Sequence, residues 1–146
     1  SFLPSEISAA FLLAQLERID QIQKKRKAIW SYYYDRLISL QNVGLCKLPH
    51  IPSYATNNGH MFYLLLPDNK LRNKLMNFLN KNHINAVFHY IPLHSSPYFK
   101  SRNNIPRLIN TDYFSERIIR LPLYCDLSNT DQDYIISKIH MFFKKI

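Results

Sequence analysis

The chain has 146 residues, 47% of them hydrophobic, with no apolar run long enough to span a bilayer and no basic leader typical of a secretion signal, so we expect a soluble, cytoplasmic protein of one domain. Only 2 glycines are present, which excludes a Gly-rich phosphate-binding loop, because such loops need several residues with positive φ. The formal net charge of +9 is scattered apart from one dense run at residues 24–27 and accompanies no nucleic-acid-binding motif, so we expect no nucleic-acid partner.

The first predicted element is a helix that runs from Pro4 to about Leu40. Pro4 suits a first helical turn, and apolar residues then recur at steps of three and four, although the stripe is interrupted at Arg26. At about 1.5 Å per residue such a helix is roughly 50 Å long, more than a small domain can cover. We therefore divide the chain into a connecting helix, residues 1–40, and a small C-terminal domain, residues 41–146, and expect part of the helix to pack against something else.

An aromatic cluster, Trp30 with Tyr32 to Tyr34, lies within this helix and extends around more than one of its faces. Burial in the core of the domain is the preferred interpretation. The alternative is an exposed surface that binds a partner.

Predicted strands and helices alternate after the connecting helix. Extended segments are predicted at 45–48, 60–66, 84–90 and 120–123. Helices are predicted at 71–79, at 112–119 and after a cap at Ser128. The second extended segment is apolar enough to be covered on both faces. This order predicts an α/β or α+β sandwich, in which helices pack on a small sheet.

Two histidines lie in the segment FHYIPLHSSPYF, residues 88–99. In an extended chain, alternation puts His94 on the same side as Tyr90 and puts His89 on the opposite side. Pro92 keeps the preceding residue out of the helical conformation, so we expect a stiff arm that delivers His94 to a surface or cleft, where imidazole and phenol groups can contact a ligand. The structural alternative, a histidine that fills a polar gap at the end of a strand, stays open for His94 and is preferred for His89.

Neither a metal site nor a catalytic residue is predicted. His89 and His94 are five residues apart with a proline between them, no carboxylate lies close in the sequence, and Cys46 and Cys125 are far apart. The serines that neighbour histidines or acidic residues fit helix caps and solvated helix edges better than a nucleophile with its base.

Four segments of the chain carry a further signal through their order. They are SFLPSEISAA with AQLE inside residues 1–17, HMFY at 60–63, FHYIPLH at 88–94 and SERIIRLPL at 115–123. In this order they resemble the C-terminal region of the DegT-type sugar aminotransferases. The resemblance spans essentially the whole chain, and several ordered motifs are more specific than any one of them.

The resemblance implies a fold type I, pyridoxal-phosphate-dependent aminotransferase that moves an amino group from glutamate to the 4-keto carbon of a dTDP-linked 6-deoxy sugar and works as a homodimer. The chain, which opens on Ser1 without a methionine, would then be the small C-terminal domain of a larger enzyme. The Schiff-base lysine and most of the phosphate site would belong to a missing major domain. Because the lysine carries the cofactor, we expect this chain alone to bind none and to be inactive.

The resemblance assigns substrate contact first to His94 and then to His89 and Tyr90. Ser1 stands where many relatives carry an asparagine that reaches the cofactor phosphate of the neighbouring subunit, and its hydroxyl can still donate one hydrogen bond. Leu3 stands where many relatives have arginine. The alternative for the whole chain is a stand-alone, non-catalytic binding or scaffolding domain that holds a partner with the aromatic cluster.

Overall fold

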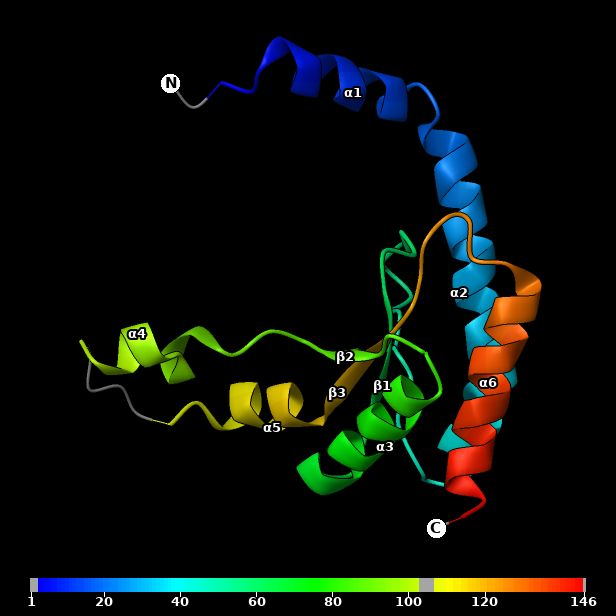
Figure 1. The fold of residues 1–146 in the computed structure, drawn as a ribbon, viewed down its shortest axis with the longest axis vertical. Coiled ribbons are helices and arrows are strands. Elements are labelled where there is room, and N and C mark those ends of the chain that lie inside the picture. The colour runs from blue at the N-terminus through cyan, green and yellow to red at the C-terminus, as the bar shows by residue number, and fades with distance from the viewer. Residues whose placement is uncertain (1–2, 103–106, 146) are drawn as a thin grey trace.

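The computed structural model describes residues 3–102 and 107–145. Its helices are α1 (Glu6–Leu16), α2 (Ile19–Asn42), α3 (Asn69–Lys81), the 3-10 helix η1 (Leu93–Ser95), α4 (Pro97–Lys100), α5 (Ile109–Arg117) and α6 (Asn129–Phe143). Its strands are β1 (Phe62–Leu65), β2 (Val87–Phe88) and β3 (Ile118–Leu121). The expected architecture of a small sheet with helices packed on it is confirmed (Figure 1). None of the described helices is long and apolar enough to cross a membrane.

The sheet is antiparallel, with β3 between β1 and β2. Alternate residues of its strands face the helices, so Phe62, Leu64 and Ile119 are completely buried. The rings of Trp30 and Tyr33 on α2 pack against Phe62 at centroid distances of 5.4 and 5.2 Å. Helix α6 lies beside α2, and α3 packs against both α6 and the sheet (Figure 1). The helices therefore cover one face of the sheet and leave the other face open.

The aromatic cluster of α2 belongs to the core, as the preferred interpretation predicted. Tyr33 is fully buried, Trp30 is 9% exposed, and the ring of Tyr34 stacks on Trp30 at 5.3 Å. The Tyr33 hydroxyl donates a hydrogen bond to the carbonyl of Pro122, at 3.0 Å. Burial raises the pKa of Tyr33, so this phenol remains a hydrogen-bond donor. The alternative hypothesis, a scaffolding domain that binds a partner through an exposed aromatic cluster, therefore lacks the surface that it requires.

The predicted connecting helix is two helices rather than one. Helical backbone angles are interrupted at Arg18 (φ −109°, ψ 11°), and α1 points away from the rest of the chain at an angle to α2 (Figure 1). No residue of α1 is buried, and Leu12 and Leu13 are 57% and 59% exposed. Since no described side chain of α1 is buried against the rest of the chain, a bend between α1 and α2 disrupts no packing.

Several of the other predicted elements differ from the structure in extent, and the segment predicted to be extended at 120–123 forms β3 two residues earlier, at Ile118–Leu121. The segment 45–48 makes one isolated bridge, Lys47 with Leu65, and the strand predicted at 84–90 is reduced to β2. The helix predicted at 112–119 ends at Arg117, because Ile118 and Ile119 pair with β1 as the first residues of β3. Their β-branched side chains suit the sheet, and this long-range pairing overrides the local helical pattern.

The last helix begins where the sequence predicts. Ser128 caps α6, and its side-chain oxygen accepts a hydrogen bond from the amide of Asp131 at 3.0 Å. Asp68 caps α3 in the same way, through the amide of Leu71 at 2.8 Å. Each such cap stabilises its helix by about 1 kcal/mol.

Arg26 explains the gap in the apolar stripe of α2. Its guanidinium donates to the carbonyls of Gly59 and His60 at 3.2 and 2.7 Å, and it thereby ties the segment before β1 to the helix. Gly59 has a φ of +59°, and a Cβ built there would lie 3.0 Å from the Arg26 carbonyl carbon. The close approach of the two backbones therefore requires glycine.

Candidate functional site

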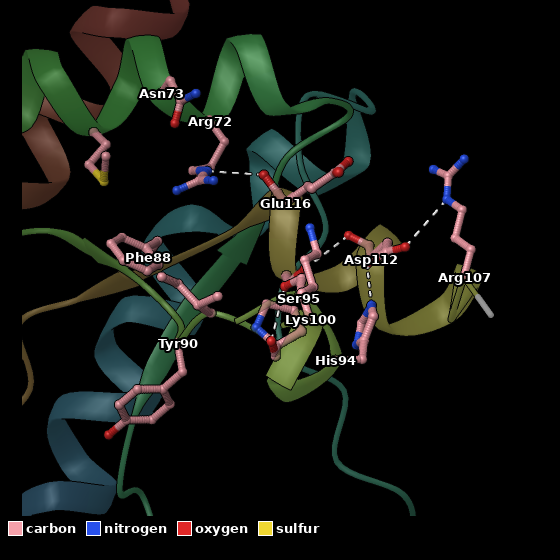
Figure 2. Close-up of a pocket in the computed structure, with 14 residues that line it drawn as sticks. Arg72, Asn73, Phe88, Tyr90, His94, Ser95, Lys100, Arg107, Asp112 and Glu116 are labelled. Carbon is pink, nitrogen blue, oxygen red and sulfur yellow. Dashed lines mark hydrogen bonds and ion pairs between the residues drawn. The ribbon is translucent and has the colours of Figure 1, made fainter. Parts of the chain in front are cut away.

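A pocket of about 930 Å³ opens between α3, the segment that follows β2, and α5 (Figure 2). Its volume falls within the range of small-molecule sites. Aromatic rings and charged groups share its wall. The charged and aromatic side chains that line it are Arg72, Lys100, Arg107, Asp112, Glu116, Phe88 and Tyr90, together with His94.

His94 and Asp112 form a sheltered pair in this pocket. Nε2 of His94 lies 2.9 Å from Oδ1 of Asp112, and their side chains are 11% and 19% exposed. A carboxylate can only accept, so Nε2 carries the proton of this hydrogen bond. In the neutral imidazole Nδ1 then presents a lone pair, and none of the hydrogen bonds between described residues involves it. The pair can therefore accept a hydrogen bond from a ligand hydroxyl.

Local structure fixes the positions of His94 and Asp112. The turn η1 places His94 between two prolines, and the hydroxyl of Ser95 donates to the Pro92 carbonyl at 3.0 Å. Asp112 lies on the first turn of α5, with Arg107 on its other side, where Arg107 Nε is 3.3 Å from Oδ2 (Figure 2). Because the Arg107 side chain is 76% exposed, this second contact is screened by water and adds little stability.

Arg72 supplies a buried positive charge to the same pocket. Only 8% of this residue is exposed, its Nε donates to the Glu116 carbonyl at 3.0 Å, and its guanidinium carbon lies 5.7 Å from the centroid of the Phe88 ring. Burial lowers the pKa of Arg72, and the Glu116 charge opposes this change. An arginine nevertheless stays protonated at neutral pH. The pocket therefore combines a fixed cation with a histidine that accepts hydrogen bonds.

Residues 4–140 match the family model described as the DegT/DnrJ/EryC1/StrS aminotransferase family. The chain belongs to this family. The resemblance of its ordered motifs to the DegT-type enzymes is thereby confirmed at the level of the family.

Solved structures of similar proteins share the fold of this chain. A DegT/DnrJ/EryC1/StrS aminotransferase from Brucella abortus is 27% identical, with a TM-score of 0.76, and the match covers 92% of this chain and 34% of that one. DesV from S. venezuelae, solved with a ketimine intermediate, has a TM-score of 0.81 at 22% identity, with 94% and 36% covered. NtdA from Bacillus subtilis, solved with bound cofactor PMP, has a TM-score of 0.75 at 23% identity, with 85% and 29% covered. The chain spans about a third of the length of these relatives.

The structure separates the residues that the family resemblance assigned to the substrate. His94 and Tyr90 line the pocket, whereas His89 does not. His89 turns toward Arg120 and His60 instead, and burial first, then the charges of these two residues, lowers its pKa. Ser1, the expected cofactor contact, lies outside the described residues. The predicted separation of the two imidazoles thus agrees with their placement, although η1 bends the arm and breaks its strict alternation.

Sequence reasoning missed Asp112 and Arg72 as members of the site. Asp112 is 18 residues from His94, and only the fold brings α5 back to the arm. Arg72 is one of the scattered cations of the sequence and lies in an amphipathic helix, where nothing local marks it as buried. The one usable signal for Asp112 was its place in the first turn of a predicted helix. Among the described residues, no group of three histidine, cysteine or acidic side chains is arranged to hold a metal ion.

Proposed function

We propose that this chain is the C-terminal, substrate-binding part of a pyridoxal-phosphate-dependent aminotransferase that aminates a nucleotide-linked keto sugar. The observation that carries the proposal is the pocket in which the His94–Asp112 pair shares a wall with Arg72, Lys100 and Arg107. Such a wall suits a ligand that has both hydroxyl groups and phosphates. The family of the chain makes transamination the reaction to expect of the complete enzyme.

The sugar is proposed from particular sequence segments. SFLPSE, HMFY and FHYIPLH look most like those of dTDP-4-amino-4,6-dideoxygalactose transaminase. We therefore take a dTDP-linked 4-keto-6-deoxy sugar as substrate, glutamate as amino donor, and lipopolysaccharide or enterobacterial common antigen biosynthesis as the pathway. The cytoplasm, where nucleotide sugars are made, is the proposed location.

Five side chains of the pocket have a role in this proposal. Arg72, Lys100 and Arg107 attract the diphosphate, Arg72 from a fixed position and the other two from the rim. His94 accepts a hydrogen bond from a sugar hydroxyl through Nδ1. Asp112 holds the proton on Nε2 and so keeps His94 in the accepting tautomer.

The described residues could line one side of a cofactor site, but they do not supply a loop that holds the cofactor phosphate. The 2 glycines of the chain are committed elsewhere, Gly44 to the end of α2 and Gly59 to its contact with Arg26, so no backbone cradle for a phosphate is left. Pyridoxal phosphate supplies an electron sink when bound. We propose that a missing major domain holds most of it, that Ser1 reaches the cofactor phosphate of a partner in a homodimer, and that this chain alone is inactive.

Mixing the purified chain with a separately expressed major domain tests the proposal. The mixture should regain cofactor absorbance and transfer the amino group of glutamate to the dTDP-linked keto sugar, while the chain alone should do neither. A stand-alone scaffolding domain would restore neither absorbance nor turnover. That outcome would remove the aminotransferase proposal.

Substitutions in the assembled enzyme test the pocket. His94→Ala should lower kcat/KM for the sugar by about 3- to 10-fold, the value of one neutral hydrogen bond, with little change in the KM for glutamate. Asp112→Ala should lower it less, because His94 remains but loses its fixed tautomer. His140→Ala, on α6 where the ring contacts the Arg36 carbonyl of α2 outside the pocket, is the control and should change neither constant. Unchanged kinetics in His94→Ala would return this histidine to a structural role.

A further inference from the structure

The open face of the sheet carries an arginine at its centre. Arg120 lies on the middle strand β3, where it pairs with Tyr63 of β1 on one side and with Val87 of β2 on the other. Its neighbours Ile119 and Leu121 turn to the face that the helices cover and are buried. Arg120 itself is partly buried, and any of its nitrogens that loses contact with water needs a hydrogen-bond acceptor in place of the lost water.

Among the described residues no such partner is found. Arg120 forms no ion pair with their carboxylates, and its Nε is buried without a hydrogen-bond acceptor. Its guanidinium carbon lies 5.3 Å from the centroid of the Tyr90 ring, a cation–π contact that supplies no acceptor atom. Nearly all buried polar atoms in native proteins are hydrogen-bonded. The unpaired nitrogen is therefore free to donate a hydrogen bond to a group from outside the described residues.

Two histidines lie near Arg120 and offer ring nitrogens for hydrogen bonding. His60, just before β1, lines with Arg120 a hollow of about 180 Å³. His89, just after β2, has a buried Nδ1 without a partner, and its pKa is lowered by burial and by the charges of Arg120 and His60. No carboxylate is among the described residues that line the hollow, and Asn85 adds a neutral amide to it. Among the described residues that line the hollow, Arg120 is thus the one charged group, and it has no counter-charge there.

We infer that Arg120, with His60 lining the same hollow and His89 close to Arg120 outside it, binds an oxyanion, the carboxylate or phosphate group of a small ligand, in the hollow on the open face of the sheet. A guanidinium presents paired donors whose spacing matches two oxygens of such a group. The site is distinct from the larger pocket, since no residue lines both. In the enzyme proposed above, an amino-donor carboxylate and a substrate phosphate are the two available sources, but the site itself does not depend on that proposal.

A nuclear magnetic resonance titration of the 146-residue chain tests the site directly. The ¹⁵N-labelled chain is titrated with inorganic phosphate and, separately, with sodium glutamate, at ionic strength held constant with sodium chloride. The Nε–H resonance of Arg120 and the ring resonances of His60 and His89 should shift in a saturable way. The ring of His140, bonded to the Arg36 carbonyl on the far helices, should not shift. Saturation by phosphate or by glutamate alone identifies the source of the oxyanion.

Variants distinguish binding from general charge attraction. Arg120→Gln should weaken the Kd at least about tenfold, a difference of ~1.4 kcal/mol, and Arg120→Lys, which keeps the charge, should restore part of the affinity. Arg102→Gln is the matched control, because Arg102 also lies over a tyrosine ring, that of Tyr98 at 4.4 Å, and this variant should bind like the unmodified chain.

The inference is overturned by either of two results. One is the absence of a saturable shift with both probes in the folded, unmodified chain, which decides the matter even if Arg120→Gln fails to fold. The other is an equal affinity in a folded Arg120→Gln variant. Because no turnover or cofactor is involved, a failure of the aminotransferase proposal leaves this test unaffected.

Discussion

Replacing each of the two glycines by alanine separates two energetic costs, that of a positive φ and that of a steric clash with a neighbouring backbone. Gly44 and Gly59 both have positive φ, +77° and +59°, so alanine pays the same backbone cost of about 1–2 kcal/mol at either position. A Cβ at Gly44 meets nothing within 4 Å. A Cβ at Gly59 lies 3.0 to 3.1 Å from backbone atoms of Arg26 and Lys27, which a helix cannot move cheaply. Overpacking of this kind adds about 1–3 kcal/mol.

We therefore expect Gly44→Ala to lower the free energy of unfolding by about 1–2 kcal/mol and Gly59→Ala to lower it by about 2–5 kcal/mol. The assay is urea unfolding followed by the fluorescence of Trp30, the only tryptophan of the chain, which is buried on α2 near the Arg26 contact. Equal losses in the two variants, or a larger loss in Gly44→Ala, would refute the claim that Gly59 is needed for close approach as well as for its backbone angle.

Three further predictions concern buried groups. Tyr33→Phe should cost about 1 kcal/mol in urea unfolding, because it leaves the Pro122 carbonyl without its donor; a neutral result would mean that water replaces the hydroxyl. Because the pKa of His89 is lowered in the folded chain, the unfolded chain binds more protons below about pH 6.5, and the free energy of unfolding should fall as the pH drops through this range. The fall should be smaller in Arg120→Gln, where the pKa of His89 rises. The same pH dependence in both chains would contradict the coupling between Arg120 and His89. Burial raises the pKa of Cys46 to about 12, so a thiol reagent at neutral pH should modify Cys125 first, and equal rates by mass spectrometry would argue against the placement of Cys46.

Local sequence signals were sufficient for the elements that local contacts determine. Ser128 and the apolar residues that follow predict α6, since a cap and a helical period both depend on neighbours within a few residues. The apolar segment before Pro67 predicts β1 in the same way. Ile118 and Ile119 show the limit: either a helix or a strand can carry them, and their pairing with β1 decides the outcome.

The candidate site depends on contacts that no local pattern contains. His94 could be singled out because two prolines and neighbouring aromatic residues mark the arm that holds it. Its partner Asp112 could not, because α5 returns to the arm only in the folded chain. Arg120 could not be singled out within SERIIRLPL either. Its place on the open face of the sheet follows from the middle position of β3, which is a long-range feature.

The isolation of α1 has a consequence for how the chain behaves on its own. A helix of 11 residues with no buried side chain lacks the tertiary packing that sustains most short helices, and helices of fewer than about 12–15 residues are only marginally stable in water. Its amide hydrogens should exchange with deuterium far faster than those of α2 between Ile29 and Leu40. A partner domain or subunit that slows the exchange of these amides must pack against α1. Deuterium uptake in α1 can therefore serve as an assay for assembly.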